Sequence, residues 1–260
     1  MVGAPSIFSR LPLIVKTPRM RASVVFASAV AIALLLLIAR TRAPAMLTIV
    51  CTTPHTPART SHMRNLCRSE GLVPFALTTE LGLFVDKNSP ECARIDSTFD
   101  PPGKPLAYAA HYATYLAVLR YFLDRSDLPL LLVLEDDIVR IASTATSVQC
   151  AVASAPPFGM LFLEYCHANC TAPSWSNAAY ATGFGAYCTS ACVFTREGAR
   201  DLLAFAGAHR PMVIDNVTQL YSNRDSVVYV TPAIFRQDRV AFAGGVTGAM
   251  ENESYTTCKT

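Results

Sequence analysis

Short apolar runs alternate with amphipathic segments along the chain beyond residue 45. Most of the runs are nearly unbroken, which is typical of strands buried on both faces of a sheet. The strands predicted in this way cover residues 46–53, 72–79, 128–135, 159–166, 186–195 and 226–232. Apolar positions at helical spacing predict helices over residues 57–71, 107–123 and 196–209. Residues 85–105, with four prolines and mixed charge, are predicted to form a loop.

The alternation of strands and helices predicts an α/β sandwich around a mainly parallel central sheet. Residues 46–260 are enough for one domain with a substantial core. In sheets of this kind, ligands bind at the carboxyl ends of the strands. Polar residues that follow a buried strand are therefore the first candidates for a site.

The N-terminal segment has a different pattern. Residues 22–39 contain no charged side chain, and this segment is long enough to span a bilayer as a helix. The basic arm 1–21 precedes it. We expect a transmembrane signal anchor, a short stem at 40–45, and a domain on the lumenal side of the membrane. Two alternatives stay open: a signal peptide cleaved near Ala43–Ala45, and an organellar transit sequence.

Charge and cysteine usage support this placement. The formal net charge is +3, yet the first 42 residues alone contribute six basic and no acidic residues. No basic stripe follows, so we expect no nucleic-acid partner. All 9 cysteines and three glycosylation sequons, at Asn169, Asn216 and Asn252, lie beyond the apolar segment. We therefore expect disulfide bonds and an oxidising compartment, the endoplasmic reticulum or the Golgi, for a single-pass type II membrane protein.

Three consecutive carboxylates, Glu135, Asp136 and Asp137, follow the apolar run that ends at residue 134. Like charges crowded at the end of a buried strand repel one another unless a cation or hydrogen-bond donors lie beside them. Oxygen ligands of this kind suit Mn²⁺ or Mg²⁺, which keep positions free for a diphosphate. The alternative is an acidic turn that begins the next helix.

Several segments resemble, in the same chain order, the pattern of glycosyltransferase family 25, which includes lipooligosaccharide and procollagen galactosyltransferases. They are HYATYLAVLRYFL (111–123), VLEDDI (133–138), GAYCTSACVFTREGARDLL (185–203), MVIDNVTQL (212–220) and TPAIFRQD (231–238). The resemblance implies a GT-A-like fold, a UDP-sugar donor and a Mn²⁺ or Mg²⁺ cofactor. The stretch CTTPHTPART (51–60) departs from the arginine-rich stretch of the family.

Carried over to this chain, the resemblance implies that Glu135, Asp136 and Asp137 bind the metal and the diphosphate. Asp137 is then the direct metal ligand, and Asp136 binds the metal or the ribose. Thr52 and Arg59, at and after the end of the first strand, are candidates for nucleotide binding. A solvated helix face is the alternative interpretation of Arg59.

Asp215 is the candidate catalytic base, because an inverting transfer needs a carboxylate to accept the proton of the acceptor hydroxyl. The alternative is that Asp215 caps the helix that follows it. Tyr187 is a candidate for the wall of the sugar pocket. His111 is either a catalytic residue or a structural histidine, since a lone histidine in a helix fits both.

The hypothesis favoured by these observations is a metal-dependent hexosyltransferase that moves a sugar, galactose-like by resemblance, to a hydroxyl of a glycan or protein. A second hypothesis is a catalytically inactive lumenal binding or adhesion module with the same fold. A third, a metal-dependent phosphohydrolase, lacks the additional Asp and His clusters such enzymes need.

Overall fold

The computed structural model describes residues 44–166, 173–183, 185, 187–238 and 241. The chain divides into two units, Met1–Arg42 and Ala43–Thr260, and the fold described here is that of the second. The predicted basic arm and transmembrane anchor lie outside the described residues. Within the described part of the chain, no helix has the length and apolarity needed to cross a membrane.

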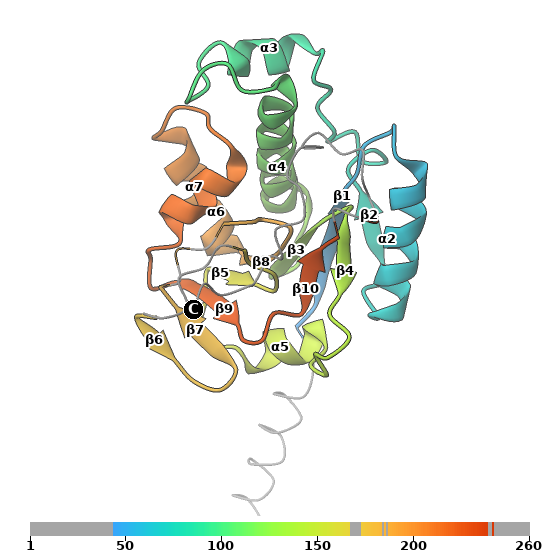
Figure 1. Cartoon of the computed structure of the whole chain (residues 1–260), viewed down its shortest axis with the longest axis vertical. Coiled ribbons are helices and arrows are strands. Elements are labelled where there is room, and N and C mark those ends of the chain that lie inside the picture. The colour runs from blue at the N-terminus through green and yellow to red at the C-terminus, as the bar shows by residue number, and fades with distance from the viewer. Residues whose placement is uncertain (1–43, 167–172, 184, 186, 239–240, 242–260) are drawn as a thin grey trace, which may run out of the picture. The chain divides into compact units, whose positions relative to one another are not determined.

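The core of the second unit is an eight-stranded sheet in the order β2-β1-β3-β8-β5-β9-β7-β6 (Figure 1). Its strands are β1 (Met46–Cys51), β2 (Phe75–Leu77), β3 (Leu130–Glu135), β5 (Met160–Phe162), β6 (Trp175–Ser176), β7 (Tyr180–Thr182), β8 (Ala191–Thr195) and β9 (Val227–Val230). A separate two-stranded antiparallel sheet joins β4 (Ile138–Arg140) to β10 (Phe235–Gln237).

The helices cover both faces of the sheet. They are α2 (Pro57–Ser69), α3 (Pro90–Asp96), α4 (Leu106–Arg125), α5 (Val148–Ser154), α6 (Arg196–Gly207) and α7 (Ile214–Tyr221). Side chains of α4, α6 and α7 form one apolar cluster with one face of the sheet. Side chains of α2 and α5 form a second cluster with the other face. The predicted α/β sandwich is therefore confirmed.

The central strand β3 shows why its apolar run is unbroken. Leu131 and Val133 belong to the cluster with α4, whereas Leu132 and Leu134 belong to the cluster with α2. Successive side chains of a strand point to opposite faces, so a strand covered by helices on both sides needs apolar residues at every position. The apolar run ends before Glu135, the last residue of β3, at the carboxyl end of the strand.

Strand direction follows the prediction except at β8 and at β7, which is antiparallel to β9 and β6. Strands β2, β1 and β3 are parallel, and so are β5 and β9. Strand β8 lies antiparallel between β3 and β5, with Ala191 opposite Leu134 and Cys192 opposite Phe162. Strand β8 therefore begins beside the carboxyl ends of its two neighbours, β3 and β5. An apolar run carries no information about strand direction, so the sequence could not predict this insertion.

The predicted loop at 85–105 contains a helix that the prolines obscured. Helix α3 begins at Pro90, and Ser89 caps it by accepting a hydrogen bond from the Cys92 N–H at 3.1 Å. Proline suits the first turn of a helix, because the N–H that it lacks has no partner there. The Ser-Pro-Glu sequence was thus a start signal for a helix.

Candidate active site

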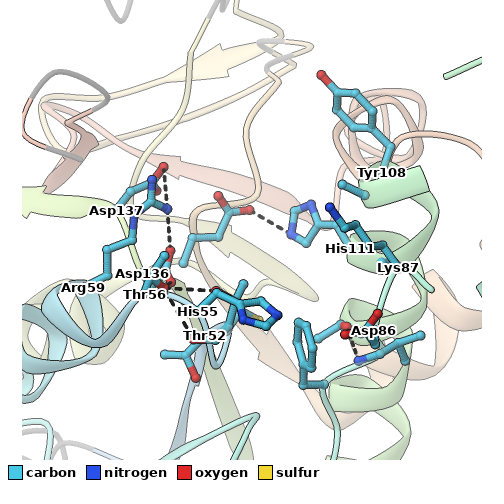
Figure 2. A pocket seen from close by; sticks show the side chains of 18 of the residues that line it. Thr52, His55, Thr56, Arg59, Asp86, Lys87, Tyr108, His111, Asp136 and Asp137 are labelled. Atoms are coloured by element: carbon cyan, nitrogen blue, oxygen red, sulfur yellow. Dashed lines mark hydrogen bonds and ion pairs between the residues drawn. The ribbon is translucent and has the colours of Figure 1, made fainter. Parts of the chain in front are cut away.

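A cavity of about 490 Å³ lies where β1 and β3 end. It brings together the segment after β1, the start of α2, the segment 84–87, one face of α4 and the acidic run (Figure 2). Asp215 from α7 and Gln237 from β10 complete the wall. Thr52, Arg59, Glu135, Asp136, Asp137 and Asp215, six residues singled out from the sequence, all line this cavity.

Asp136 is the most buried of the three consecutive carboxylates, at 6% exposed, and both of its oxygens have partners. Arg59 Nη1 lies 2.9 Å from Oδ1, and the Thr56 hydroxyl donates to Oδ2 at 3.2 Å. Burial raises the pKa of Asp136, and these two donors oppose the rise. Arg59 is therefore not on a solvated helix face but is the counter-ion of the acidic run.

Asp137 shares the same cation at a longer distance. Its Oδ2 lies 4.0 Å from Arg59 Nη1, and its Oδ1 accepts a hydrogen bond from the Gln237 amide at 3.4 Å. One guanidinium nitrogen thus faces both aspartates. Figure 2 shows Arg59, Asp136 and Asp137 grouped on one side of the cavity.

Glu135 shares Gln237 with Asp137 and has His111 as a further partner. Its Oε1 lies 3.2 Å from His111 Nε2, and its Oε2 accepts a hydrogen bond from Gln237 at 2.9 Å. Burial lowers the pKa of His111, but the carboxylate of Glu135, with smaller contributions from Asp215 and Asp137, raises it to about 9. At neutral pH the imidazole is therefore a cation. His111 and Arg59 are the two positive groups that the crowded carboxylates required.

Asp215 lies in the first turn of α7, two residues after the N-cap residue Val213. The interpretation of Asp215 as the helix cap is therefore wrong, because its side chain bonds elsewhere. Its Oδ1 accepts hydrogen bonds from the N–H of Thr189 at 3.0 Å and from the Thr189 hydroxyl at 2.9 Å. Burial raises the pKa of Asp215, as does Glu135, while His111 and Thr189 oppose the rise.

Thr52 and Tyr187 have different outcomes. Thr52 lines the cavity, with its N–H bonded to Thr78 Oγ1 at 2.9 Å and its hydroxyl 3.0 Å from Thr79 Oγ1. Tyr187 is not among the residues that line the cavity; it pairs with Cys166 in an isolated bridge. Its role in a sugar pocket stays a prediction.

The wall opposite Arg59 contains residues that sequence reasoning missed. Asp86 and Lys87 follow β2 in the segment predicted as a loop, and Tyr108 lies one turn before His111 on α4 (Figure 2). His55 and Phe84 also line the cavity. Tyr108 could have been predicted, because it is three residues before His111 and so lies on the same face of a helix. No pattern in the sequence indicated the other residues.

The acidic run offers a divalent cation at most two aspartates from the protein. Asp136 and Asp137 both face one cationic nitrogen, so a cation is accommodated between their oxygens. No group of three His, Cys, Asp or Glu side chains in the described ranges could hold a metal ion. Mn²⁺ or Mg²⁺ bound here would take Asp137 and Asp136 from the protein and its other ligands from water and phosphate, as Mg²⁺ commonly does.

Two further features involve residues that do not line the cavity. Glu164, two residues after β5, is 3% exposed, and its Oε2 has no hydrogen-bond partner among the described residues. Burial raises the pKa of Glu164 to about 8, opposed in part by the Ser190 hydroxyl. A disulfide joins Cys166 to Cys188, as the cysteine usage predicted in general. Cys51, Cys67, Cys92, Cys150 and Cys192 are free thiols.

Comparisons with known proteins give a similarity to solved structures. No family model matches the chain, and no curated protein matches it. Among solved structures, it is similar to the crystal structure of a glycosyltransferase involved in the glycosylation of the major capsid of PBCV-1, at 10% identity and a TM-score of 0.42. The similarity covers 75% of this chain and 93% of that chain.

Proposed function

We propose that this chain is a metal-dependent glycosyltransferase that moves a sugar from a nucleoside diphosphate to a hydroxyl group of a glycan or protein. The observation that carries the proposal is the cavity at the carboxyl ends of β1 and β3. It combines a cation, a pair of aspartates and a separate, half-buried carboxylate within one space. A nucleotide sugar needs all three: a positive group for its diphosphate, ligands for a metal, and a base for the acceptor.

The donor would lie against the α2 side of the cavity. Arg59 offers N–H donors to the diphosphate, and arginine suits phosphate oxygens because its planar donors match them. Thr52, which lines the cavity after the end of β1, would contact the nucleotide. Asp137 and Asp136 would hold Mn²⁺ or Mg²⁺, which when bound neutralises negative charge on the leaving diphosphate.

The acceptor would be activated on the α7 side. In a single displacement, the acceptor oxygen forms a bond to the anomeric carbon while the bond from that carbon to the diphosphate oxygen breaks. The electron pair leaves with the diphosphate, and Asp215 takes the proton of the acceptor hydroxyl. Imidazolium His111 balances the charge of Glu135, so that Asp215 is not left beside an uncompensated carboxylate.

The narrower assignments follow from the sequence. The order of the motifs supports a GT-A-like member of glycosyltransferase family 25 with a UDP-hexose donor, galactose-like by resemblance. The apolar segment 22–39, the sequons and the disulfide support a type II membrane protein of the endoplasmic reticulum or Golgi. These assignments extend the proposal to the secretory pathway.

The proposal is tested with the full chain, purified in detergent and incubated with a panel of nucleotide sugars and Mn²⁺. Release of free nucleotide from one donor, dependent on an acceptor and lost on chelation, is the expected result. Asp137→Ala should abolish release, whereas Asp124→Ala, an exposed aspartate near the end of α4, should not. Full activity of Asp137→Ala would contradict the proposal that a metal bound by Asp137 is needed for transfer.

One observation favours the alternative of a binding or adhesion module. Both oxygens of Asp136 are already bonded, to Arg59 and Thr56, so this carboxylate is neutralised without a metal. Calorimetry with UDP separates the two functions. The transferase should bind UDP more tightly with Mn²⁺ than without it, and a module that lacks the reaction should bind no nucleotide under either condition.

A further inference from the structure

The hydrogen-bond donors that orient the carboxylate of Asp215 lie outside its own helix, α7. Both of its hydrogen bonds come from Thr189 and both end on Oδ1. Among the described residues, no hydrogen bond reaches Oδ2. One residue therefore sets the direction of the side chain, and one oxygen is left for a ligand in the cavity that Asp215 lines.

Thr189 is itself fixed in place. It is fully buried and follows Cys188, whose φ of 75° lies in the left-handed region that favours glycine. A non-glycine residue persists there only where its surroundings hold it. Cys188 is held by its disulfide to Cys166, and Tyr187 and Cys166 exchange backbone hydrogen bonds at 3.1 and 3.2 Å. This turn directs the Thr189 N–H toward Asp215.

The Thr189 hydroxyl lies between two carboxylates. Its Oγ1 is 2.9 Å from Asp215 Oδ1 and 3.3 Å from Glu135 Oε1. A hydroxyl carries one proton, so it donates to one of these acceptors at a time. The shorter distance and the neighbouring N–H favour Asp215, while Glu135 has His111 and Gln237 as other donors. Thr189 thus lies between the two carboxylates and donates to Asp215, which has no other hydrogen-bond donor among the described residues.

We propose that Thr189 is the positioning residue for acceptor activation, and that the Cys166–Cys188 disulfide holds it in register. This inference rests on the proposed function and deepens it. Donor binding would depend on Thr52, Arg59 and the paired aspartates, and acceptor activation on the disulfide-linked turn before β8. A change in the turn should therefore affect the rate of transfer and leave the affinity for the donor unchanged.

Kinetics of Thr189→Val in the full chain test the inference. This variant keeps the shape of the side chain and removes the hydroxyl. We expect kcat to fall by about 10- to 100-fold, as for a catalytic group displaced from its productive position, with the donor KM unchanged. The hydroxyl bond lowers the pKa of Asp215, so its loss should move the rise of activity with pH to higher pH. Thr189→Ser, which keeps the hydroxyl, should restore both the rate and the pH profile.

Two controls separate positioning from general stability. Thr144→Val removes a buried hydroxyl that donates to the carbonyl of Ala233 at 2.9 Å, and it should lower the melting temperature without shifting the pH profile. In an Asp215→Asn background, Thr189→Val should cause no further loss of rate. If Thr189→Val does not fold, Thr189→Ala removes the same hydroxyl with less bulk.

The outcomes are distinct. An active wild type whose rate and pH profile are unchanged by the loss of the Thr189 hydroxyl overturns the inference and leaves the proposed function standing. A loss of rate that adds to that of Asp215→Asn also overturns it, because Thr189 would then act elsewhere. A wild type that turns over no nucleotide sugar overturns the proposed function and the inference together.

Discussion

On the α2 side of the cavity, Asp136 and Asp137 face a cation that a divalent ion could replace. On the α4 and α7 side, Glu135 and Asp215 are held by His111, Gln237 and Thr189. Arg59 and Thr56 come from a single stretch of α2 and the residue before it. The donors of the second side come from α4, from the turn before β8 and from β10.

This difference has a physical consequence for function. Under the proposed function, the two carboxylates shared by one guanidinium would exchange that cation for a metal, and the arginine would turn to a phosphate. A carboxylate fixed by a fully buried hydroxyl and N–H has no such freedom. The first side is therefore suited to bind and release a charged donor, and the second to hold one group still during the reaction. Predictions about each side test this division.

The largest effect is expected for Asp137→Ala. If the α2 side holds the metal, this variant should lose turnover by about a thousandfold or more, since the metal supplies several kcal/mol of charge stabilisation. Titration with Mn²⁺, followed by electron paramagnetic resonance in the presence of UDP, should show weaker binding. Normal Mn²⁺ binding by the variant would place the metal elsewhere.

Asp215→Asn should have the next largest effect. Removing a general base costs about 10²- to 10⁴-fold in rate, and the amide cannot accept the proton of the acceptor. The measured kcat should fall while UDP and Mn²⁺ bind as in the wild type. A parallel loss of UDP affinity would show that the two sides of the cavity are not separate.

Arg59→Gln should weaken UDP binding by about 10- to 100-fold, the value of a hydrogen bond to a charged group. It should also strengthen Mn²⁺ binding without nucleotide, because the competing cation is gone. Calorimetry measures both affinities. The matched control is Arg64→Gln on the same helix, whose partner is the exposed Glu80; it should change neither, and an identical response of the two variants would refute the exchange.

The last prediction concerns the free energy of unfolding, not turnover, and tests Glu164 behind the second side of the cavity. Glu164 has a folded-state pKa of about 8, above its ordinary 4.5. Its stabilising contribution is therefore complete below pH 4.5 and is lost as pH rises to 8, by at most about 1.4 kcal/mol per pH unit. Glu164→Gln, neutral in both states, should be more stable than the wild type at pH 8 but not at pH 5.

Urea unfolding at both pH values measures this effect. Glu80→Gln, at an exposed glutamate, should alter the free energy of unfolding little at either pH. If the difference between Glu164→Gln and the wild type is the same at pH 5 and pH 8, the buried carboxyl is ionised in the folded protein.

Local patterns in the sequence were enough to predict much of the fold. Unbroken apolar runs located β1, β3 and β9, because a strand buried on both faces has apolar residues at successive positions. Helical spacing located α2, α4 and α6, because a helix buried along one stripe repeats its apolar residues with the helical period. The acidic run at the end of β3 and Asp215 were also recognised. The short strands β6 and β7 and the helix α3 were missed, since a few residues or several prolines leave too weak a pattern.

The partners of the site residues could not be predicted in the same way. Gln237 is 102 residues from Glu135, and Thr189 is 54 residues from it. The contact of Thr189 depends on β8 entering the sheet antiparallel between β3 and β5, and that of Gln237 depends on the pairing of β10 with β4. No local pattern encodes either arrangement.

The sequence by itself determined which residue types were available: a buried strand followed by carboxylates, an arginine on the helix that follows β1, and a cysteine before Thr189. Only the tertiary structure decided which carboxylate each donor would neutralise. The reason is that electrostatic and hydrogen-bond partners are chosen by distance in space, and the order of strands in the sheet sets that distance.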